Sequence, residues 1–190
     1  NASAGEMEER IKDRLGKVNA KRVKSATFAS LMMTQFKQIS RGRKAVIGPE
    51  QYSFVKRALS SANVGYDDLD EWMSTIEYLG RDLDFQPNGT PSSKVFVEYC
   101  NILQRYKRYD LNMMARELIK GLNDGTIKPY EHTHILCDEF QDTDNLQYSW
   151  LKAHGDRGKK LAVVGDDDQS IYSWRGSMGY DAFVAFQKDF

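Results

Sequence analysis

Two acidic segments of the chain each follow a short apolar run. Asp138 and Glu139 follow residues 135–137, and Asp166 opens an acidic run after residues 163–165. Adjacent carboxylates at the end of a buried strand are costly unless they are solvated, paired or bound to a cation. One carboxylate can hold Mg²⁺, directly or through water, while its neighbour orients and deprotonates a water molecule. The alternative is a solvated turn that merely contains acidic residues, and the first segment alone does not distinguish the two.

The second acidic segment adds residues suited to phosphate and nucleic-acid binding. Gln169 offers an amide that can contact a phosphate or an attacking water without adding charge. Tyr172, Trp174 and Arg175 combine two stacking surfaces with a guanidinium, the combination that single-stranded nucleic acid requires. Gly165, at the end of the apolar run, permits another backbone to approach closely. The alternative places Tyr172 and Trp174 in the core and pairs Arg175 with an acid.

Both segments need parallel strands that end at one edge of a sheet. Apolar runs at residues 134–137 and 161–164 predict two strands, and residues 145–153 between them predict a helix. A strand, a helix and a second apolar strand in this order indicate a parallel pair, whose carboxyl ends form the ligand-binding edge of an α/β sheet. Residues 22–28 predict a third short strand.

Helices are expected over most of the remaining chain. Met7, Ile11 and Leu15 recur at helical spacing, so a helix should run until Gly16. Further helices are expected over residues 31–39, 49–59, 67–79, 92–109 and 111–122.

The composition excludes several classes of protein. The 190 residues are 41% hydrophobic and 28% charged, as in a globular domain. No apolar run approaches the ~18–20 residues that cross a membrane, and the charged N-terminus lacks a secretory signal. Cys100 and Cys137 have no metal-binding spacing, so neither a disulfide framework nor a structural zinc site is expected. We therefore expect a cytoplasmic protein with no membrane partner.

A formal net charge of zero hides an uneven distribution along the chain. Residues 1–44 contain 11 Lys and Arg residues against 4 Asp and Glu residues, so the remainder is acidic. A basic end beside an acidic remainder fits contact with a polyanion next to a metal site, and solvated helix faces give the same pattern.

Taken together, the two acidic segments resemble motifs of the UvrD/Rep/PcrA-like superfamily 1 DNA helicases. DEFQDT at residues 138–143 resembles their Walker B motif, and VGDDDQSIY with WRG, over residues 164–176, resembles their third helicase motif. Weaker similarity extends to residues 3–11, as the tail of motif Ia, and to residues 26–28, as motif Ib. The helical middle, residues 45–107, matches in position only.

The resemblance implies a role for each matched residue in ATP hydrolysis. Asp138 would be the Mg²⁺-associated carboxylate, and Glu139 would be the base for the water that attacks the γ-phosphate. Gln169 would sense that phosphate and couple the nucleotide state to the grip on DNA. Asp142 would be a structural or network carboxylate, with a direct ligand as the alternative. Arg175 would belong to both the nucleotide site and the DNA site.

The resemblance also implies contacts with DNA. Tyr172 and Trp174 would stack on bases of single-stranded DNA, with Arg175 bracing that site or reaching the strand. Thr27 would face the DNA backbone, near the basic residues 17–24.

The implied fold is α/β, a partial RecA-like P-loop NTPase domain that carries a helical insertion. Residues 1–44 and 108–190 would form the motor part, with about three parallel strands, and residues 45–107 would form the insertion. The chain departs from the family in lacking the Walker A sequence GxxxxGK[S/T]. It also has Ala29 where the family usually has a histidine after motif Ib.

The implied function is that of a fragment of an ATP-dependent DNA helicase or translocase, acting on single-stranded DNA and on single-strand/duplex junctions. The family's second motor domain would follow the last residue, and the fragment is expected to be inactive alone. The alternative is a catalytically degenerate, helicase-like DNA-binding or scaffold module. The outer edge of the strand at residues 161–164 is expected to lack a partner strand and to pair with a second copy.

Overall fold

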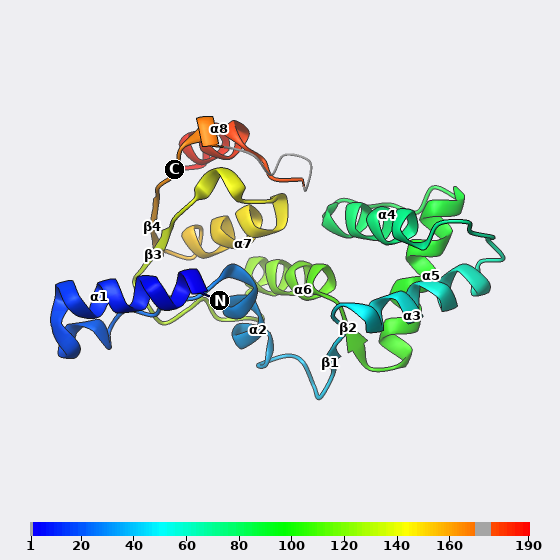
Figure 1. Ribbon diagram of the computed structural model, residues 1–190, viewed down its shortest axis with the longest axis horizontal. Helices are drawn as coiled ribbons and strands as arrows, with labels where there is room; N and C mark the ends of the chain where they lie inside the picture. The colour runs from blue at the N-terminus through cyan, green and yellow to red at the C-terminus, as the bar shows by residue number, and fades with distance from the viewer. Residues whose placement is uncertain (1, 170–175) are drawn as a thin grey trace.

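The computed structural model describes residues 2–169 and 176–190 (Figure 1). Its helices and strands follow one another as α1 (Ala2–Ala20), α2 (Phe28–Phe36), β1 (Lys44–Ala45), α3 (Pro49–Ser61), α4 (Leu69–Arg81), α5 (Pro91–Arg105), β2 (Arg108–Tyr109), α6 (Leu111–Asp124), β3 (His134–Cys137), α7 (Asn145–Gly155), β4 (Lys160–Val163) and α8 (Tyr180–Asp189). Two short 3₁₀ helices, η1 (Phe140–Asp142) and η2 (Asp167–Gln169), follow β3 and β4. The mixture of helices with short parallel strands agrees with the expected α/β class.

Strands β3 and β4 form a parallel pair, as the sequence predicted. Their register runs from His134 opposite Lys160 to Cys137 opposite Val163. One face of the pair packs on the core, whereas Leu136 is 76% exposed on the other face. Helices α7 and α8 lie on the covered side in Figure 1. The pair therefore has one covered and one open face, and its two carboxyl ends lie together.

The third strand that was expected over residues 22–28 is not formed. Thr27 instead caps helix α2, because its hydroxyl accepts the Ser30 backbone N–H at 3.3 Å. Phe28 begins that helix and packs edge-on against Trp150, with ring centroids 5.9 Å apart. Each of the two sheets in the described part of the chain consequently has two strands, not three.

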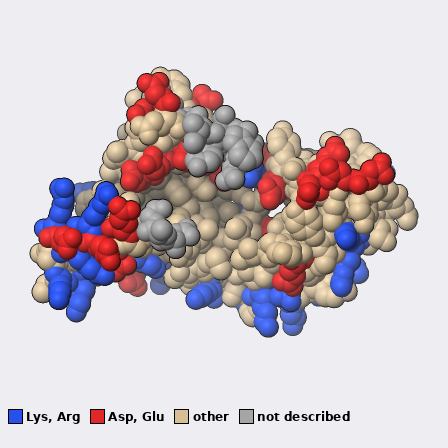
Figure 2. Space-filling view, viewed as in Figure 1, with Lys and Arg blue, Asp and Glu red and all other residues tan. Residues whose placement is uncertain are grey.

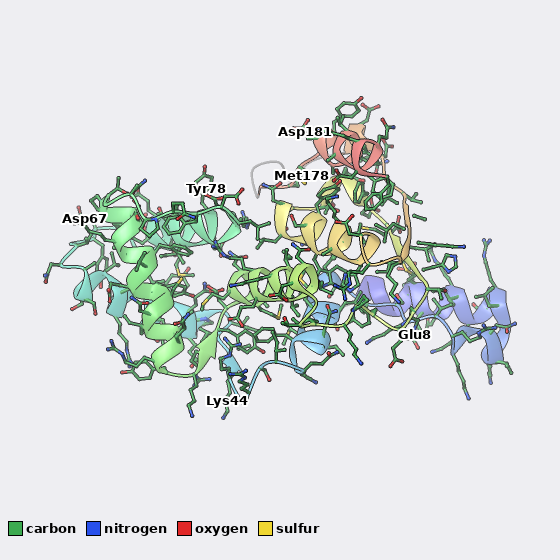
Figure 3. All side chains as sticks on the ribbon, turned by 180° about the vertical axis from the view of Figure 1, so that it is seen from behind. Glu8, Lys44, Asp67, Tyr78, Met178 and Asp181 are labelled. Carbon is green, nitrogen blue, oxygen red and sulfur yellow. The ribbon has the colours of Figure 1, made fainter. Side chains whose placement is uncertain are left out.

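The second sheet joins the two ends of the helical middle. β1 pairs in parallel with β2, with Lys44 opposite Arg108 and Ala45 opposite Tyr109. Lys44, labelled in Figure 3, marks this junction. The helix predicted over residues 92–109 is therefore too long: α5 ends at Arg105, and the left-handed backbone of Lys107 (φ 53°) turns the chain into β2. The pairing brings the two expected boundaries of the insertion together, although the division into two parts stays a prediction.

Helices α3, α4 and α5 pack against one another between those boundaries. Their starts carry the usual signals, with proline in the first turn of α3 and α5 and the Asp68 side chain capping α4. Their shared core contains the fully buried side chains of Val55, Leu59, Val95 and Leu103. The helical middle thus has an apolar centre of its own.

Helix α6 connects the helical middle with the rest of the chain, because it packs against α4 as well as against α2 and α7. Asp110 caps its first turn by accepting the Met113 backbone N–H at 2.7 Å. The Tyr99 hydroxyl, from α5, donates to the same carboxylate at 2.9 Å. Burial raises the pKa of Asp110, and these two hydrogen bonds oppose that shift. The cap therefore fixes α5 and α6 at a common point.

Some of the basic residues near the N-terminus form ion pairs within helix α1. Gly16, with φ 72° and ψ 158°, breaks α1 as expected, although a further helical turn continues to Ala20. Arg10 and Lys12 pair with Glu6 and Glu8 one turn earlier, at 2.6 and 2.8 Å. Figure 2 shows both signs of charge mixed over this helix, whose side chains, Glu8 included, extend from the body in Figure 3. These pairs are a solvated helix face, so contact with a polyanion stays a prediction for residues 17–24.

Among the residues that the structure describes, none of the helices combines the length and the apolar character that a membrane-spanning helix requires.

A buried polar cluster ties α2 to α7. The Trp150 indole N–H donates to Gln35 Oε1 at 2.9 Å, and Gln35 Nε2 donates to the Lys128 carbonyl at 3.0 Å. His154 Nδ1 donates to the Trp150 carbonyl at 2.8 Å, which leaves Nε2 to face the Gln35 amide at 3.3 Å. His154 is fully buried, and this burial lowers its pKa below the ordinary 6.5. The cluster therefore holds a neutral imidazole.

Because the His154 imidazole is buried in its neutral form, we expect the free energy of unfolding to fall in mild acid. Because the folded pKa lies below 6.5, the stabilisation is complete above that pH and is lost as the pH falls toward the folded value. Urea unfolding should give a lower free energy of unfolding at pH 5.5 than at pH 7.5, with a difference that depends on His154. His154→Gln should reduce the pH dependence, whereas the same change at exposed His132 should leave it intact. Equal pH dependence in all three proteins would rule out the assignment.

Candidate active site

The backbone joins the ends of β3 and β4 beyond the last strand residues. Val164 N–H donates to the Cys137 carbonyl at 2.8 Å, and Phe140 N–H donates to the Val164 carbonyl at 3.0 Å. The two acidic segments that follow these strands therefore lie side by side, as the strand–helix–strand pattern predicted. The edge of the sheet formed by the carboxyl ends of β3 and β4, with the two acidic segments that follow them, is the candidate active site.

Glu139 stands in an unusual backbone conformation at this edge. It has left-handed φ and ψ angles of 51° and 46°, which cost a non-glycine residue about 1–2 kcal/mol. Its N–H donates to Asp138 Oδ1 at 3.0 Å, and both acidic side chains are exposed. Phe140, fully buried against the rings of Phe183 and Phe186, anchors the next residue. The buried ring thus holds a strained turn that presents Asp138 and Glu139 to solvent.

Gln141 is a site residue to which the sequence analysis gave no role. Its side chain is buried, at 2% exposure, although it lies between exposed acids. Nε2 donates to Glu139 Oε2 at 2.7 Å, and Oε1 accepts the Asp166 backbone N–H at 3.1 Å. Gln141 therefore bridges the two acidic segments. Only the tertiary fold reveals this, because the bond to Asp166 spans 25 residues of the sequence.

Gly165 makes that bridge possible, in agreement with the close approach expected for it. A Cβ at this position would lie 2.3 Å from Gln141 Oε1 and 2.8 Å from the Phe140 nitrogen. Both distances are well inside van der Waals contact, so a larger residue would displace the amide of Gln141 or the turn beside it.

Gln169 is held at the same edge by Asp166. Its Nε2 donates to Asp166 Oδ2 at 2.7 Å, while the Asp168 backbone N–H donates to Oδ1 of the same carboxylate at 3.1 Å. The three other residues predicted for this segment, Tyr172, Trp174 and Arg175, lie outside the described residues.

The acidic edge has features that suit a cation. Burial and the nearby Glu139 carboxylate raise the pKa of Asp142, and its Oδ1 is buried without a hydrogen-bond partner in the described part. A nearby positive ion favours the charged form of a carboxylate and so opposes both effects. Among the described residues no three His, Cys, Asp or Glu side chains gather closely enough to cage a metal. Mg²⁺ commonly keeps several waters and uses one or two carboxylates, so a site for it does not require such a cage.

Thr27 is not brought to this edge by any contact of the described residues. Its hydroxyl serves as the cap of α2, and it is half-buried. The basic residues before it are exposed, and Lys24 lies over the Tyr130 ring, 5.7 Å from its centroid. Thr27 and these residues would form a separate contact surface.

A second residue that sequence reasoning missed is Arg81, at the end of α4. It lines a cavity of about 240 Å³ between the helical middle and helices α2, α6 and α7. Its Nη1 is 2.8 Å from the place that a Cβ of Gly176 would occupy. Two residues of this region, Asp144 and Ser177, form an antiparallel bridge. The chain that follows residues 170–175 is therefore held between α4 and the start of α7.

Comparisons with known proteins place the whole chain in one group. The family model for the UvrD/REP helicase N-terminal domain matches residues 1–190. DNA helicase II of Escherichia coli is 63% identical over 46 residues, which are 24% of this chain and 6% of that protein. The ATP-dependent DNA helicase Rep of E. coli is 28% identical over 215 residues, covering 100% of this chain and 31% of Rep. The ATP-dependent DNA helicase PcrA of Staphylococcus aureus is 28% identical over 212 residues, covering 100% of this chain and 29% of PcrA. The chain thus spans about a third or less of these relatives.

Because Gly165 lies so close to Gln141 and Phe140, we expect a larger residue at this position to destabilise the fold. Gly165→Ala should lower the free energy of unfolding by about 1–3 kcal/mol, because the methyl group would collide with Gln141 Oε1 and the Phe140 backbone. Gly65→Ala is the matched control, since its Cβ would meet nothing within 4 Å. Urea unfolding measures both variants. Equal stability of the two variants would contradict the close approach at Gly165.

Proposed function

Because the chain belongs to the UvrD/REP helicase N-terminal domain family, we propose that it is part of an ATP-dependent DNA helicase or translocase. Relatives that bear the name ATP-dependent DNA helicase align over the whole chain. The observation that carries the proposal is the meeting of Glu139 and Asp166 at one strand edge, bridged by Gln141.

In this proposal, Asp138 and Glu139 have different roles in ATP hydrolysis: Asp138 holds the metal ion and Glu139 acts as the base. Bound Mg²⁺ would neutralise charge on the β- and γ-phosphates of ATP. Asp138 would hold that ion, directly or through water, because its carboxylate is exposed just beyond the end of β3. Glu139, exposed and oriented by its left-handed backbone, would orient the attacking water and accept its proton. Gln169 would contact the γ-phosphate as a neutral donor.

Contacts with DNA form the second part of the proposal. Thr27 and the exposed basic residues 17–24 would bind the phosphate backbone, and Tyr172 and Trp174 would stack on bases of single-stranded DNA. Arg175 would reach the strand or the nucleotide. The substrate would be single-stranded DNA and its junctions with duplex DNA.

The proposal assigns the chain to part of a larger motor. Residues 1–44 and 108–190 would be part of a RecA-like domain, residues 45–107 its helical insertion, and a second motor domain would complete the ATP site. The 190 residues contain no Walker A sequence, so we expect no ATP hydrolysis by this chain alone.

The open edge of β4 suggests self-association of the isolated chain. Lys160 and Val164 donate their N–H groups toward β3, so by alternation the N–H groups of Leu161 and Val163 face away from it. No strand pairs with that edge in the described ranges. An exposed edge of this kind favours pairing with a second copy.

The central prediction concerns ATP hydrolysis by the full-length gene product. DNA-stimulated turnover should fall at least ~100-fold in Glu139→Gln, because the amide cannot accept the proton of the attacking water. Glu131→Gln, at an exposed position just before β3, is the matched control and should retain the wild-type rate. Steady-state phosphate release with and without single-stranded DNA measures both.

Two results would contradict this assignment. Full activity of Glu139→Gln would remove Glu139 from the role of base. A well-folded full-length protein that binds DNA without hydrolysing ATP would favour the degenerate scaffold module over the motor.

The unpaired side of strand β4 leads to a separate prediction, which concerns the oligomeric state of the isolated chain. Light scattering of the isolated chain at high concentration should report the mass of a dimer. Val163→Pro removes the outward N–H and should restore the monomer mass, whereas Val163→Thr keeps the N–H and should remain dimeric. A monomer mass for the unaltered chain would exclude edge pairing.

A further inference from the structure

We propose that Gln141 is a positioning residue that links the orientation of Glu139 to the conformation of Gln169, through Asp166. This inference rests on the proposed function, because it assigns Glu139 and Gln169 their roles in hydrolysis. The link consists of three side-chain hydrogen bonds that join the two segments without a break.

The first half of the link runs from Glu139 to the second segment. Gln141 Nε2 donates to Glu139 Oε2 at 2.7 Å, and Gln141 Oε1 accepts the Asp166 backbone N–H at 3.1 Å. The orientation of the amide is fixed by its partners, since a carboxylate only accepts and a backbone N–H only donates. Gln141 is 2% exposed, so its amide is shielded from water while it makes these two bonds.

The second half runs from Asp166 to Gln169. The Asp166 carboxylate accepts from Gln169 Nε2 at 2.7 Å, and its other oxygen accepts the Asp168 backbone N–H at 3.1 Å. The backbone of Gln169 also donates to the Asp166 carbonyl at 3.2 Å. Asp166 therefore fixes the 3₁₀ turn that carries Gln169, while its own N–H is fixed by Gln141.

Glutamine is the residue type that this position requires. It must donate to a carboxylate and accept from a backbone N–H at the same time, from one buried side chain. An ionised glutamate cannot donate, methionine cannot donate and accepts only weakly, and asparagine is one methylene shorter. The absence of a Cβ at Gly165 supplies the space, because Gln141 Oε1 lies 2.3 Å from where that atom would be.

The order of these hydrogen bonds means that a movement of Gln169 would be passed on to Glu139. When Gln169 turns toward a γ-phosphate, it must leave or pull Asp166 Oδ2, and this displaces the turn after β4. Gln141 transmits the displacement to the Glu139 carboxylate, which is exposed and has no other side-chain hydrogen bond to the described residues. Glu139 would therefore be aimed at the attacking water only in one state of Gln169.

The first test uses the 190-residue chain and needs no activity. In Gln141→Met, hydrogen exchange of the Asp166 backbone amide, followed by NMR, should accelerate at least fivefold, because its acceptor is gone. Gln187→Met, an exposed change in α8, should leave that rate unchanged. Unchanged exchange in a folded Gln141→Met protein would overturn the proposal.

A second variant keeps the test decisive if Gln141→Met does not fold. Glu139→Gln alters only an exposed side chain. It should shift the side-chain amide signals of Gln141 and, through Asp166, those of Gln169, while the Gln187 signals stay in place. Absence of any shift at Gln141 and Gln169 would overturn the link.

The full-length gene product supplies the kinetic readout. Gln141→Met should lower kcat for ATP at least tenfold and change KM less than threefold, since Gln141 positions the base and does not bind nucleotide. In a Glu139→Gln background the same change should cause no further loss, because both changes act on one group. A further tenfold loss in the double variant would overturn the proposal. An inactive wild-type protein would instead refute the proposed function, and the exchange experiment would still decide the link.

Discussion

The parallel pairing of β3 with β4 is the constraint on which the candidate site depends. The four paired residues of each strand set the register, and two further backbone bonds, from Val164 to Cys137 and from Phe140 to Val164, extend it past the strand ends. A shift of one residue would turn Leu136 inward and Cys137 outward, and would move Asp138 away from Asp166. The buried side chains beneath the sheet therefore fix the distance between the two acidic segments.

The same edge concentrates negative charge, and its geometry shows how the fold tolerates this. Asp138 and Glu139 are exposed, so water solvates them, and Asp166 accepts hydrogen bonds from Gln169 and Asp168. Asp142 is the exception: burial raises its pKa, and one of its oxygens has no partner in the described ranges. A cation at this edge would favour the charged form of Asp142 and would give its unpaired oxygen a partner. Local stability and the proposed binding of Mg²⁺ would therefore depend on the same carboxylates.

The helical middle is anchored at two places. The pairing of β1 with β2 closes its two ends, and Arg81 of α4 reaches Gly176, where the chain returns after residues 170–175. The buried cluster of Gln35, Trp150 and His154 holds α2 to α7 on the other side of α6. A displacement of α4 would thus be felt at Gly176.

The sequence by itself determined the local features: the bounds of β3, the helices that begin at Pro49, Leu111 and Asn145, and the acidic pairs placed after apolar runs. Periodicity and capping residues carry that information within a few residues. Only the tertiary structure decided that residues 22–28 cap and begin a helix, that Arg108 and Tyr109 leave α5 for a strand, and that Gln141 bridges the site. In each case the deciding partner is distant in the sequence: Trp150 for Phe28, Ala45 for Tyr109 and Asp166 for Gln141. Such partners compete with local propensity only once the chain has folded.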